Sequence, residues 1–462
     1  MKKILWVVGA GGPPFEYALP RLAARADVYA FVATDVSPLQ RSLLAQWCVD
    51  TTDLDGTDDG DICQALVAAG RRYGVDGIVT FSEFGVIAVA DACAVLGLPG
   101  PGPNAQLARD KWLMRKRWDE TGLPVPRFAK VENLRDLETA TQSLTLPILL
   151  KASGRGGGIG QQVIDSKTSL PQALSHAETA LTQAADHGIV EYSGNLDTAH
   201  WVAEEIIDST IDSWYDDPRY GDFLSVEGVV ARGTYHPICA TGRLPTLPPF
   251  AEMGAVSPCV LREELQRKIE ELSRAAVDAL GLDTCGTHTE IKLMADEGMC
   301  LLETAARPGG STATTLAEYV FGVDLLGLQT AEALGEPQSY PEQMLVTGEG
   351  AAASVYLFAA DTRGRPWSSP VRFDWRQIDW SGLVSPASRV EIIPSQMVPE
   401  GTVVSPYRPG SGALNYCGSV IVRSPDPGTL IADSYRLIDT LEENCERVPA
   451  GTTMVAGDSN AT

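Results

Sequence analysis

Short apolar runs alternate with amphipathic segments over the first part of the chain. The runs Ile4–Val8, Val28–Val32 and Gly77–Phe81 have the length and apolar content of buried strands. Between them, Phe15–Ala24 and Asp61–Tyr73 place their apolar residues at helical spacing. Strands that alternate with helices in this way predict βαβ units and an open parallel sheet.

Turn-rich segments and further amphipathic stretches divide the rest of the chain. The sequence LPGPGP at Leu98–Pro103 breaks the pattern, and Asn104 then has the position of an N-cap for a helix over Ala105–Thr121. Helices are also predicted at Arg262–Leu280 and Pro427–Arg447. We therefore expect a mixed α/β chain divided into residues 1–103, 104–123, 124–210, 211–340, a β-rich extension at 341–450 and a disordered tail at 451–462.

The composition indicates which classes of partner are disfavoured and in which cellular compartment the protein is expected. The chain has 462 residues, 44% hydrophobic and 21% charged, and its net charge of −24 argues against nucleic acid or an anionic membrane as a partner. No run approaches the roughly 20 apolar residues that cross a bilayer, and Ile4–Val8 is too short for a signal peptide. Nine cysteines without a C-x-x-C pair fit reduced thiols, so we expect a cytoplasmic protein.

A glycine-rich loop follows an apolar strand in the segment Leu149–Gln161, LLKASGRGGGIGQ. Its glycines leave backbone N–H groups free to approach phosphate oxygens, and Lys151 and Arg155 add positive charge. The spacing is not that of a Walker A motif. The loop residues expected to contact a nucleotide are Ser153, Gly156, Gly157 and Gly158. A surface loop without a ligand is the alternative, but a lysine that ends the preceding strand favours nucleotide binding.

Two turns that end predicted parallel strands are candidates for ligand contact. Gly9–Gly12 closes the first strand, but two prolines follow, so the turn lacks the G-x-G-x-x-G pattern of dinucleotide sites. Ser82 and Glu83 follow the strand at Gly77–Phe81, where α/β sheets place ligand contacts. We therefore predict that Glu83 contacts a substrate.

The segment His288–Gly310, HTEIKLMADEGMCLLETAARPGG, predicts a hairpin because two strand-like runs flank an Asp-Glu-Gly turn. Alternation puts His288 and Glu290 on one face, and pairing would bring Glu303 of the returning strand near Glu290. Two carboxylates on neighbouring strands suit Mg²⁺ that bridges the phosphates of a nucleotide. Arg307 follows, where it would stabilise a transferring phosphoryl group. A solvated hairpin with surface acids is the alternative, which the apolar character of both runs disfavours.

Two further strands carry acidic residues of interest. Trp201–Asp208, WVAEEIID, suits an adenine-binding hinge, in which backbone groups read the base edge and apolar side chains sandwich the ring. Leu224–Val230, LSVEGVV, places Glu227 toward a cleft by strand alternation. Both patterns also occur in ordinary half-buried strands, which stays the alternative for each.

The order of these features resembles that of the ATP-grasp superfamily. Lys111 comes first, Lys151 with its glycine loop follows, and then come Glu204–Ile207, SVEG and the acidic hairpin. The resemblance covers about residues 1–335, and LSVEG, THTEIK and LLETAAR are most similar to the L-amino acid ligases of the superfamily. It implies an α/β fold with an N-terminal parallel-sheet domain, a lid subdomain at 124–210 and a large catalytic subdomain at 211–340. The C-terminal region would complete the large subdomain and support a homodimer.

The resemblance also implies roles for the matching positions. Lys111 and Lys151 would contact the phosphates of ATP, and Glu290 and Glu303 would bind two Mg²⁺ ions, with Mn²⁺ as the alternative metal. Arg307 would stabilise the acyl phosphate and the tetrahedral intermediate. The residues implied to hold the adenine and its surroundings are Glu204, Glu205, Ile207 and Glu227. Those implied to meet the amino-acid substrate are Glu83, Glu252, His288, Arg307, Gly309, Gly310 and Ser311.

Two positions depart from the pattern of the family. Ala305 stands two residues after Glu303, where many ATP-grasp enzymes carry an asparagine, so the resemblance implies that metal binding depends more on the two carboxylates. Ser311 stands where an amino acid ligase of this type carries a bulky aromatic residue. A smaller side chain leaves more room, so a larger first substrate is expected.

The activity that the resemblance implies is ligation of a carboxylate to an amine through an acyl phosphate, with amino acids or amino-acid-like acids as substrates. The setting would be a specialised pathway such as antibiotic synthesis. Three alternatives stay open: a biotin-dependent carboxylase subunit, a purine-pathway or carbamoyl-type ligase, and a nucleotide-binding regulator without turnover. An M-K-M biotin attachment motif does not occur in this sequence, which counts against the first.

Overall fold

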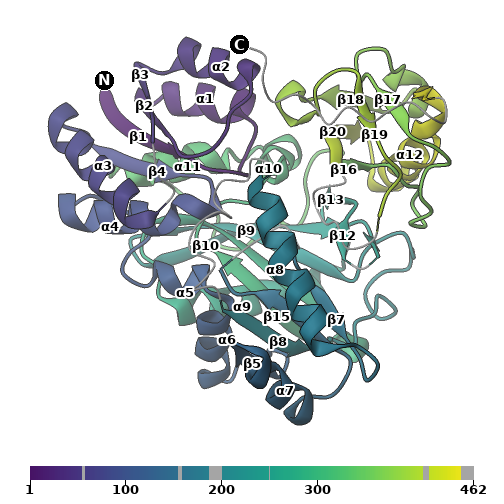
Figure 1. Ribbon diagram of the computed structural model, residues 1–462. Coiled ribbons are helices and arrows are strands. Elements are labelled where there is room, and N and C mark those ends of the chain that lie inside the picture. The colour runs from purple at the N-terminus through teal and green to yellow at the C-terminus, as the bar shows by residue number, and fades with distance from the viewer. Residues whose placement is uncertain (55–57, 155–158, 187–199, 249, 409–415, 449–462) are drawn as a thin grey trace.

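The computed structural model describes residues 1–448 except 55–57, 155–158, 187–199, 249 and 409–415 (Figure 1). The predicted phosphate contacts Gly156, Gly157 and Gly158 and the tail at 451–462 therefore lie outside the described residues. No helix in the described ranges is long and apolar enough to cross a membrane.

The N-terminal part is a parallel sheet between helices, as the alternating pattern predicts. Its strands have the order β3-β2-β1-β4, and β1 pairs in parallel with β2 and β4. Alternate side chains of β1 enter two different cores: Trp6 packs with α1 and α11 (Leu325–Ala333) on one face, and Leu5 packs with α3 and α4 on the other. Burial on both faces explains why the strand is a continuous apolar run. The bounds are β1 (Lys2–Val8), β2 (Ala26–Val32), β3 (Asp50–Asp53), β4 (Gly77–Thr80), α1 (Phe15–Ala23), α2 (Pro38–Trp47), α3 (Asp59–Tyr73) and α4 (Val86–Leu96).

The linking helix differs from the prediction of one continuous helix over Ala105–Thr121. It consists of α5 (Ala105–Arg109) and α6 (Lys111–Glu120), and Asp110 between them is extended. The Asp110 carboxylate accepts hydrogen bonds from the backbone N–H groups of Trp112 and Leu113, so it caps α6 from inside the predicted run. Asn104 does not cap α5 with its side chain, because its amide donates to the carbonyl of Gly281 instead.

A small antiparallel sheet carries the strand that precedes the glycine loop. Its order is β5-β8-β6-β7, and β6 pairs with β8 from Ile148↔Glu205 to Ala152↔Trp201. The apolar faces of its two helices pack against this sheet and form a separate core. The bounds are β5 (Phe128–Val131), β6 (Ile148–Ala152), β7 (Gln162–Ile164), β8 (Trp201–Glu205), α7 (Leu134–Ser143) and α8 (Leu170–Asp186).

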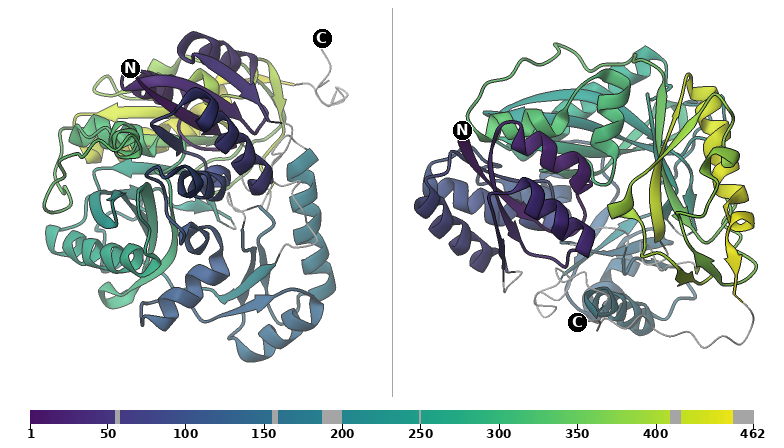
Figure 2. Two further views of the ribbon diagram at one scale, coloured as in Figure 1. Left: turned by 90° about the vertical axis from the view of Figure 1, so that its left-hand side faces the viewer. Right: turned by 90° about the horizontal axis from the view of Figure 1, so that it is seen from above.

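A large antiparallel sheet forms the body of the molecule, in the order β15-β14-β9-β10-β13-β16-β20-β18. Its last three strands come from the predicted β-rich extension, so that segment continues the same sheet (Figure 2). The strand bounds are β9 (Phe223–Ala231), β10 (Thr234–Arg243), β13 (Gly254–Ser257), β14 (Cys285–Leu293), β15 (Met299–Ala305), β16 (Ala351–Phe358), β18 (Arg389–Ile392) and β20 (Tyr416–Ser424). Two smaller sheets flank it, with strands β11 (Thr246–Leu247), β12 (Ala251–Glu252), β17 (Val371–Phe373), β19 (Thr402–Val404) and β21 (Glu446–Arg447).

Four helices cover the large sheet: α9 (Glu263–Leu280), α10 (Ala313–Phe321), α11 (Leu325–Ala333) and α12 (Pro427–Thr440). The helix predicted at Arg262–Leu280 is present, with Arg262 in the capping position. The last helix is shorter than the predicted Pro427–Arg447. It ends at Thr440, and a 3-10 turn at Leu441–Asn444 leads into β21, because the final residues pair with β17 instead of continuing the helix.

Candidate functional site

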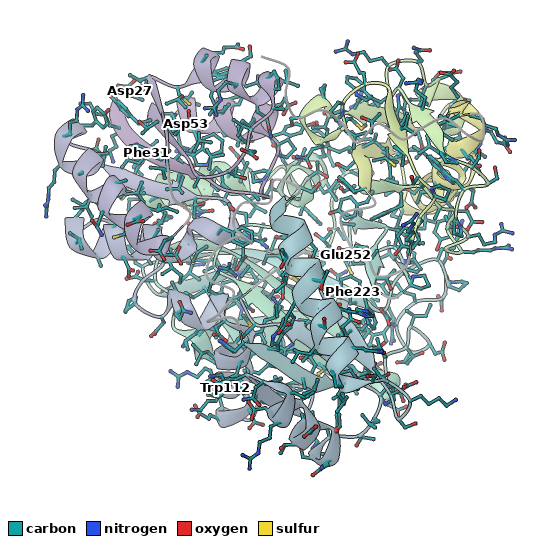
Figure 3. The ribbon with its side chains drawn as sticks, in the orientation of Figure 1. Asp27, Phe31, Asp53, Trp112, Phe223 and Glu252 are labelled. Atoms are coloured by element: carbon teal, nitrogen blue, oxygen red, sulfur yellow. The ribbon has the colours of Figure 1, made fainter. Side chains whose placement is uncertain are left out.

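A cavity of about 620 Å³ lies where the small sheet, the large sheet and the first glycine turn meet. Residues of four regions line it: Gly11 from the N-terminal turn, Lys151 from β6, Glu303 from β15 and Tyr356 from β16. Glu252 and Phe223, which also line it, are labelled in Figure 3. Its volume is in the range of small-molecule sites in proteins.

The acidic hairpin lies in this cavity with the two predicted carboxylates side by side. Glu290 of β14 and Glu303 of β15 are register partners, and both line the cavity. The Nζ of Lys111 lies 3.0 Å from Glu303 Oε2. Burial would raise the pKa of Glu303, but Lys111, Lys151 and Arg307 outweigh it and lower the pKa to about 2. Glu303 is therefore ionised at neutral pH, as a metal ligand must be.

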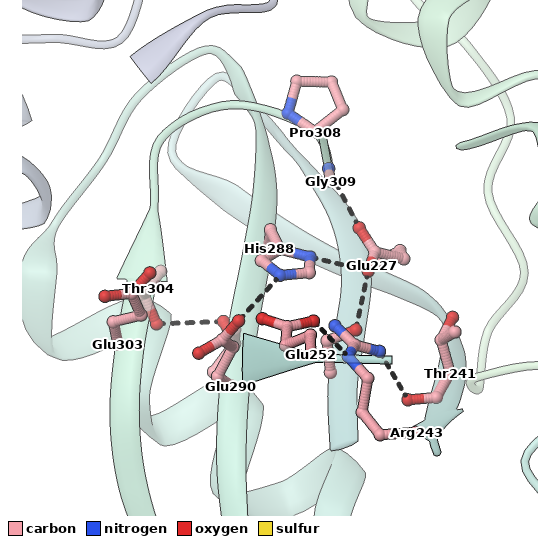
Figure 4. A network of polar contacts seen from close by, with 12 residues as sticks. Glu227, Thr241, Arg243, Glu252, His288, Glu290, Glu303, Thr304, Pro308 and Gly309 are labelled. Carbon is pink, nitrogen blue, oxygen red and sulfur yellow. Dashed lines mark hydrogen bonds and ion pairs between the residues drawn. The ribbon is translucent and has the colours of Figure 1, made fainter. Parts of the chain in front are cut away.

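His288 lies between two carboxylates on the wall of the cavity (Figure 4). Its Nδ1 is 2.7 Å from Glu227 Oε1, and its Nε2 is 3.3 Å from Glu290 Oε1. Burial lowers the pKa of His288, but the two carboxylates outweigh that effect and raise the pKa to about 9. His288 is thus a buried cation at neutral pH, and it orients Glu290.

Glu227 does not face the cleft as strand alternation predicted. It is fully buried and is not among the residues that line the cavity. Its carboxylate accepts hydrogen bonds from the hydroxyl of Ser225 and the backbone N–H of Gly309, in addition to its contact with His288. Glu227 therefore lies behind His288 as seen from the cavity. Its three partners allow the buried carboxylate to remain charged.

The carboxylate of Glu204 is held by two cations. Lys151 forms an ion pair with Glu204 Oε1, and Arg115 Nε lies 3.3 Å from Oε2. Burial lowers the pKa of Lys151, which the Glu204 charge opposes. The Glu204 carboxylate therefore already has its partners. An adenine bound at this strand would instead contact the backbone of the strand and the residues Ile206 and Ile207, which line the cavity. Arg115 is completely buried, and no motif in the sequence marked it as a site residue.

Two residues predicted near the nucleotide have other partners. Glu205 touches the cavity, but its carboxylate accepts hydrogen bonds from Arg127 and from the backbone N–H of Thr145. Ser153 is fully buried and does not line the cavity; its hydroxyl donates to Asp110 and accepts from the N–H of Trp112. Ser153 thus belongs to the cap of α6, and it fixes the start of that helix, with Lys111, against the end of β6.

The loop after β15 joins the cavity to the N-terminal sheet. Arg307 lines the cavity, and its Nε donates to Glu83 Oε2 at 2.9 Å. Glu83 itself does not line the cavity, so it contacts the site through Arg307. Further along this loop, the N–H of Ser311 donates to the carbonyl of Gly12 at 2.9 Å. Gly310 and Ser311 line the cavity, whereas Gly309 is buried against Glu227.

An opposite-charge pair lies beside the acidic residues of the hairpin. Glu252 of β12 lines the cavity, and Arg243 of β10 is nearly completely buried behind it, with Nε 3.4 Å from Glu252 Oε2 (Figure 4). Burial and the nearby Glu290 raise the pKa of Glu252, while Arg243 lowers it. Arg243 was missed by the sequence analysis. The sequence does contain a signal for it: the segment ICATGR consists of small and apolar residues and ends in an arginine.

Comparisons with known proteins agree with this arrangement. The ATP-grasp N-terminal domain family matches residues 30–100, and the ATP-grasp domain family matches residues 116–198. The chain is 32% identical over 269 residues to an alanine–anticapsin ligase of Bacillus subtilis, which is 58% of this chain and 56% of that protein. It is 22% identical over 297 residues to an L-arginine-specific L-amino acid ligase of the same species, covering 63% and 67% of the two chains.

A solved structure extends the likeness to the whole fold. An L-amino acid ligase from Bacillus licheniformis superposes with a TM-score of 0.73 over 97% of this chain and 98% of its own, at 20% identity. The sequence match to the alanine–anticapsin ligase spans just over half the length of that protein. The two family matches agree with the architecture of a parallel sheet, a small antiparallel sheet and a large antiparallel sheet: residues 30–100 and 116–198 match ATP-grasp families, and the chain has the ATP-grasp fold.

Proposed function

We propose that this protein is an ATP-dependent ligase that joins the carboxylate of one amino acid, or of an amino-acid-like acid, to the amine of another. The observation that supports it most strongly is the pairing of Glu290 with Glu303 in a cavity that Lys111, Lys151 and Arg307 also line. An acidic pair beside three cations suits a metal-bound triphosphate next to a second anion. The likeness to alanine–anticapsin ligases supports amino acids as substrates and a specialised pathway.

The acidic pair fits a magnesium–nucleotide complex. Glu290 and Glu303 offer oxygen ligands from neighbouring strands, and Mg²⁺ in proteins commonly uses one or two carboxylates together with phosphate oxygens. Over the described ranges there is no group of three or more His, Cys, Asp or Glu side chains placed to hold a metal ion, so the remaining ligands would be phosphates and water. When bound, Mg²⁺ would offset negative charge on the phosphates.

The first step forms an acyl phosphate. A carboxylate oxygen of the substrate attacks the γ-phosphorus of ATP, the new P–O bond forms, and the bond to the ADP oxygen breaks. Lys111 and Lys151 would bind phosphate oxygens, and Lys111 already reaches Glu303. Arg307, which helps to lower the pKa of Glu303, is close enough to the acidic pair to offset charge on the transferred group.

The second step forms the amide. A neutral amine attacks the acyl carbon, phosphate leaves, and the nitrogen loses one proton. Arg307 would stabilise the oxyanion of the tetrahedral intermediate. Glu252 lines the same cavity and would meet the amino group of the substrate. An acyl phosphate is lost to water in an open site, so closure around these residues is part of the proposal.

The direct test is product analysis. Purified protein with ATP, MgCl₂ and pairs of amino acids should release phosphate and yield a dipeptide of the expected mass. Glu303→Gln should lower the rate more than about 100-fold because it removes a metal ligand. Glu264→Gln, an exposed acid of α9, is the matched control and should leave the rate unchanged.

Other outcomes would support other functions. ATP hydrolysis that depends on bicarbonate and rises with biotin would indicate a carboxylase. Nucleotide binding without turnover in any amino-acid mixture would indicate a regulator, and either result would refute the ligase assignment.

A further inference from the structure

Three aromatic side chains form one wall of the cavity. Tyr356 and Phe358 lie two residues apart on β16, so both project to the same face, and Tyr416 of β20 is the register partner of Phe358. The rings of Tyr356 and Phe358 each lie 5.9 Å from the ring of Tyr416 and meet it edge to face. All three line the cavity. They lie outside the residues that the two family matches cover.

The aromatic wall offers apolar surface, and its hydroxyls carry no charge. Phe358 is buried apart from its cavity side, and Tyr356 and Tyr416 are partly buried. Burial raises the pKa of Tyr356 to about 12, and it raises the pKa of Tyr416 further, so both stay neutral at working pH. Edge-to-face rings of this kind favour a further aromatic ring as a neighbour, since such pairs gain energy beyond the area they bury.

Ser311 leaves the space in front of these rings open. It lines the cavity in a left-handed conformation with φ 51°, and its N–H bond to Gly12 fixes its place. Its Oγ is buried next to the hydroxyls of Tyr356 and Tyr416, with which it interacts.

A charged pair borders the aromatic wall. The backbone N–H of Tyr356 donates to the carbonyl of Met253 at 2.9 Å, which places β16 directly beside Glu252. Arg243 also lines the cavity, and its Nε lies 3.4 Å from Glu252 Oε2. A carboxylate and a guanidinium side by side match the ammonium and carboxylate groups of a free α-amino acid.

We infer that this end of the cavity binds an α-amino acid with an aromatic side chain, whose ring lies against Tyr356, Phe358 and Tyr416. The charged groups of the amino acid would meet Glu252 and Arg243. This inference rests on the proposed ligase function, because it assigns the class of one of the two substrates. Ser311 supplies the room for the ring.

The test is substrate selectivity, measured as kcat/KM for L-phenylalanine relative to L-alanine with a common second amino acid. The native protein should prefer L-phenylalanine at least about tenfold, the scale that a well-matched apolar pocket provides. Tyr356→Ala should lower this ratio about tenfold by removing one wall of the pocket. Tyr73→Ala removes a partly buried tyrosine outside the cavity and should leave the ratio unchanged.

A binding measurement separates this inference from the ligase assignment. Calorimetric titration of L-phenylalanine and of L-alanine into the full chain, with Mg²⁺ and a non-hydrolysable ATP analogue, should show tighter binding of L-phenylalanine that Tyr356→Ala abolishes. That result with no ligation of any pair would refute the ligase and retain the aromatic site. Ligation of small amino acids with no preference for L-phenylalanine in either assay would refute the aromatic site alone. Should Tyr356→Ala not fold by thermal melting, Tyr356→Leu keeps the bulk, removes the ring and should lower the ratio in the same direction.

Discussion

At the scale of single residues, the cations around the cavity are more informative than the carboxylates. Arg115 and Lys151 both pair with the single carboxylate of Glu204. These three buried side chains together carry one more positive than negative charge beside the cavity. A buried excess charge is expensive unless a ligand of opposite sign neutralises it. In the proposed function ATP would provide that charge, which would give Arg115 a part in nucleotide binding although it does not line the cavity.

Arg115→Met should therefore weaken ATP binding. We expect the Kd for ATP to rise about fivefold to tenfold, because the local field at the phosphates falls while a side chain of similar length fills the space. Equilibrium binding of a fluorescent ATP analogue measures the change. Lys116→Met, an exposed neighbour on α6, is the control and should leave the Kd unchanged. An unchanged Kd together with a large loss of stability would instead make Arg115 a purely structural residue.

The residue scale also shows where sequence reasoning stops. The predicted hairpin pairing correctly placed Glu303 beside Glu290, because the two strands follow each other in the chain. Strand alternation failed for Glu227, whose exposure depends on His288 of the next strand and on Gly309 of a distant loop. Which face of a central strand meets a cavity is decided by neighbours that local spacing does not reveal.

At the scale of elements, side-chain capping of helices and pairing between strands set element boundaries that the hydrophobic periodicity did not predict. Asp110 divides a run that reads as one helix, and its partner Ser153 lies on a different sheet. The edge strand β3, Asp50–Asp53, has the polar sequence DTTD and was not predicted. It forms because the neighbouring β2 offers unpaired backbone groups, a cause that no property of the four residues signals.

Helix α9 shows an element held in place by one buried acid. Glu270 bonds Arg267 and Arg274 of its own helix and accepts from the backbone N–H of Met344, which joins α9 to the segment after α11. Burial raises the pKa of Glu270, but the two arginines outweigh it, so the folded pKa is below its ordinary value.

Glu270→Gln should lower the free energy of unfolding by about 1–2 kcal/mol at pH 7, the scale of charge-assisted hydrogen bonds to partly exposed partners. The carboxylate has a depressed pKa in the folded state, so its stabilisation is present above the unfolded pKa of about 4.3 and is lost as the pH falls through the folded pKa. Urea unfolding curves of the two proteins should therefore differ at pH 7 and converge toward pH 4 and below. Glu271→Gln, the exposed neighbour, should show no pH-dependent difference.

At the scale of the whole molecule, distant segments meet at the cavity and at one further contact. The overall charge is −24, yet lysines and arginines gather around the acidic pair, so net charge did not predict the polarity of the site. The family resemblance ended near residue 335, whereas β16, β20 and β18 continue the same sheet. The aromatic wall was invisible from the sequence because Tyr356 and Tyr416 are brought together only by long-range strand pairing.

A polar contact joins the N-terminal domain to the end of the large sheet. Glu391 of β18 accepts hydrogen bonds from the hydroxyls of Tyr17 on α1 and Tyr319 on α10, and the Arg423 guanidinium lies 3.9 Å from the centre of the Tyr319 ring. One carboxylate thus links three elements that are far apart in the chain. Because the first glycine turn of the N-terminal domain reaches the cavity through Gly11, this contact also supports the site.

Glu391→Gln should loosen the contact on both of its sides at once. The amide is a weaker acceptor than the carboxylate, so we expect backbone hydrogen exchange of α1 and of β18 to accelerate together, with a loss of about 1 kcal/mol in unfolding free energy. Exchange in β6 and β8 of the small sheet, which Glu391 does not touch, should stay unchanged. Glu400→Gln breaks an exposed pair with Arg376 and is the matched control. Acceleration confined to β18 would show that the carboxylate holds only its own strand, because a contact that truly couples the domains must release both partners when it weakens.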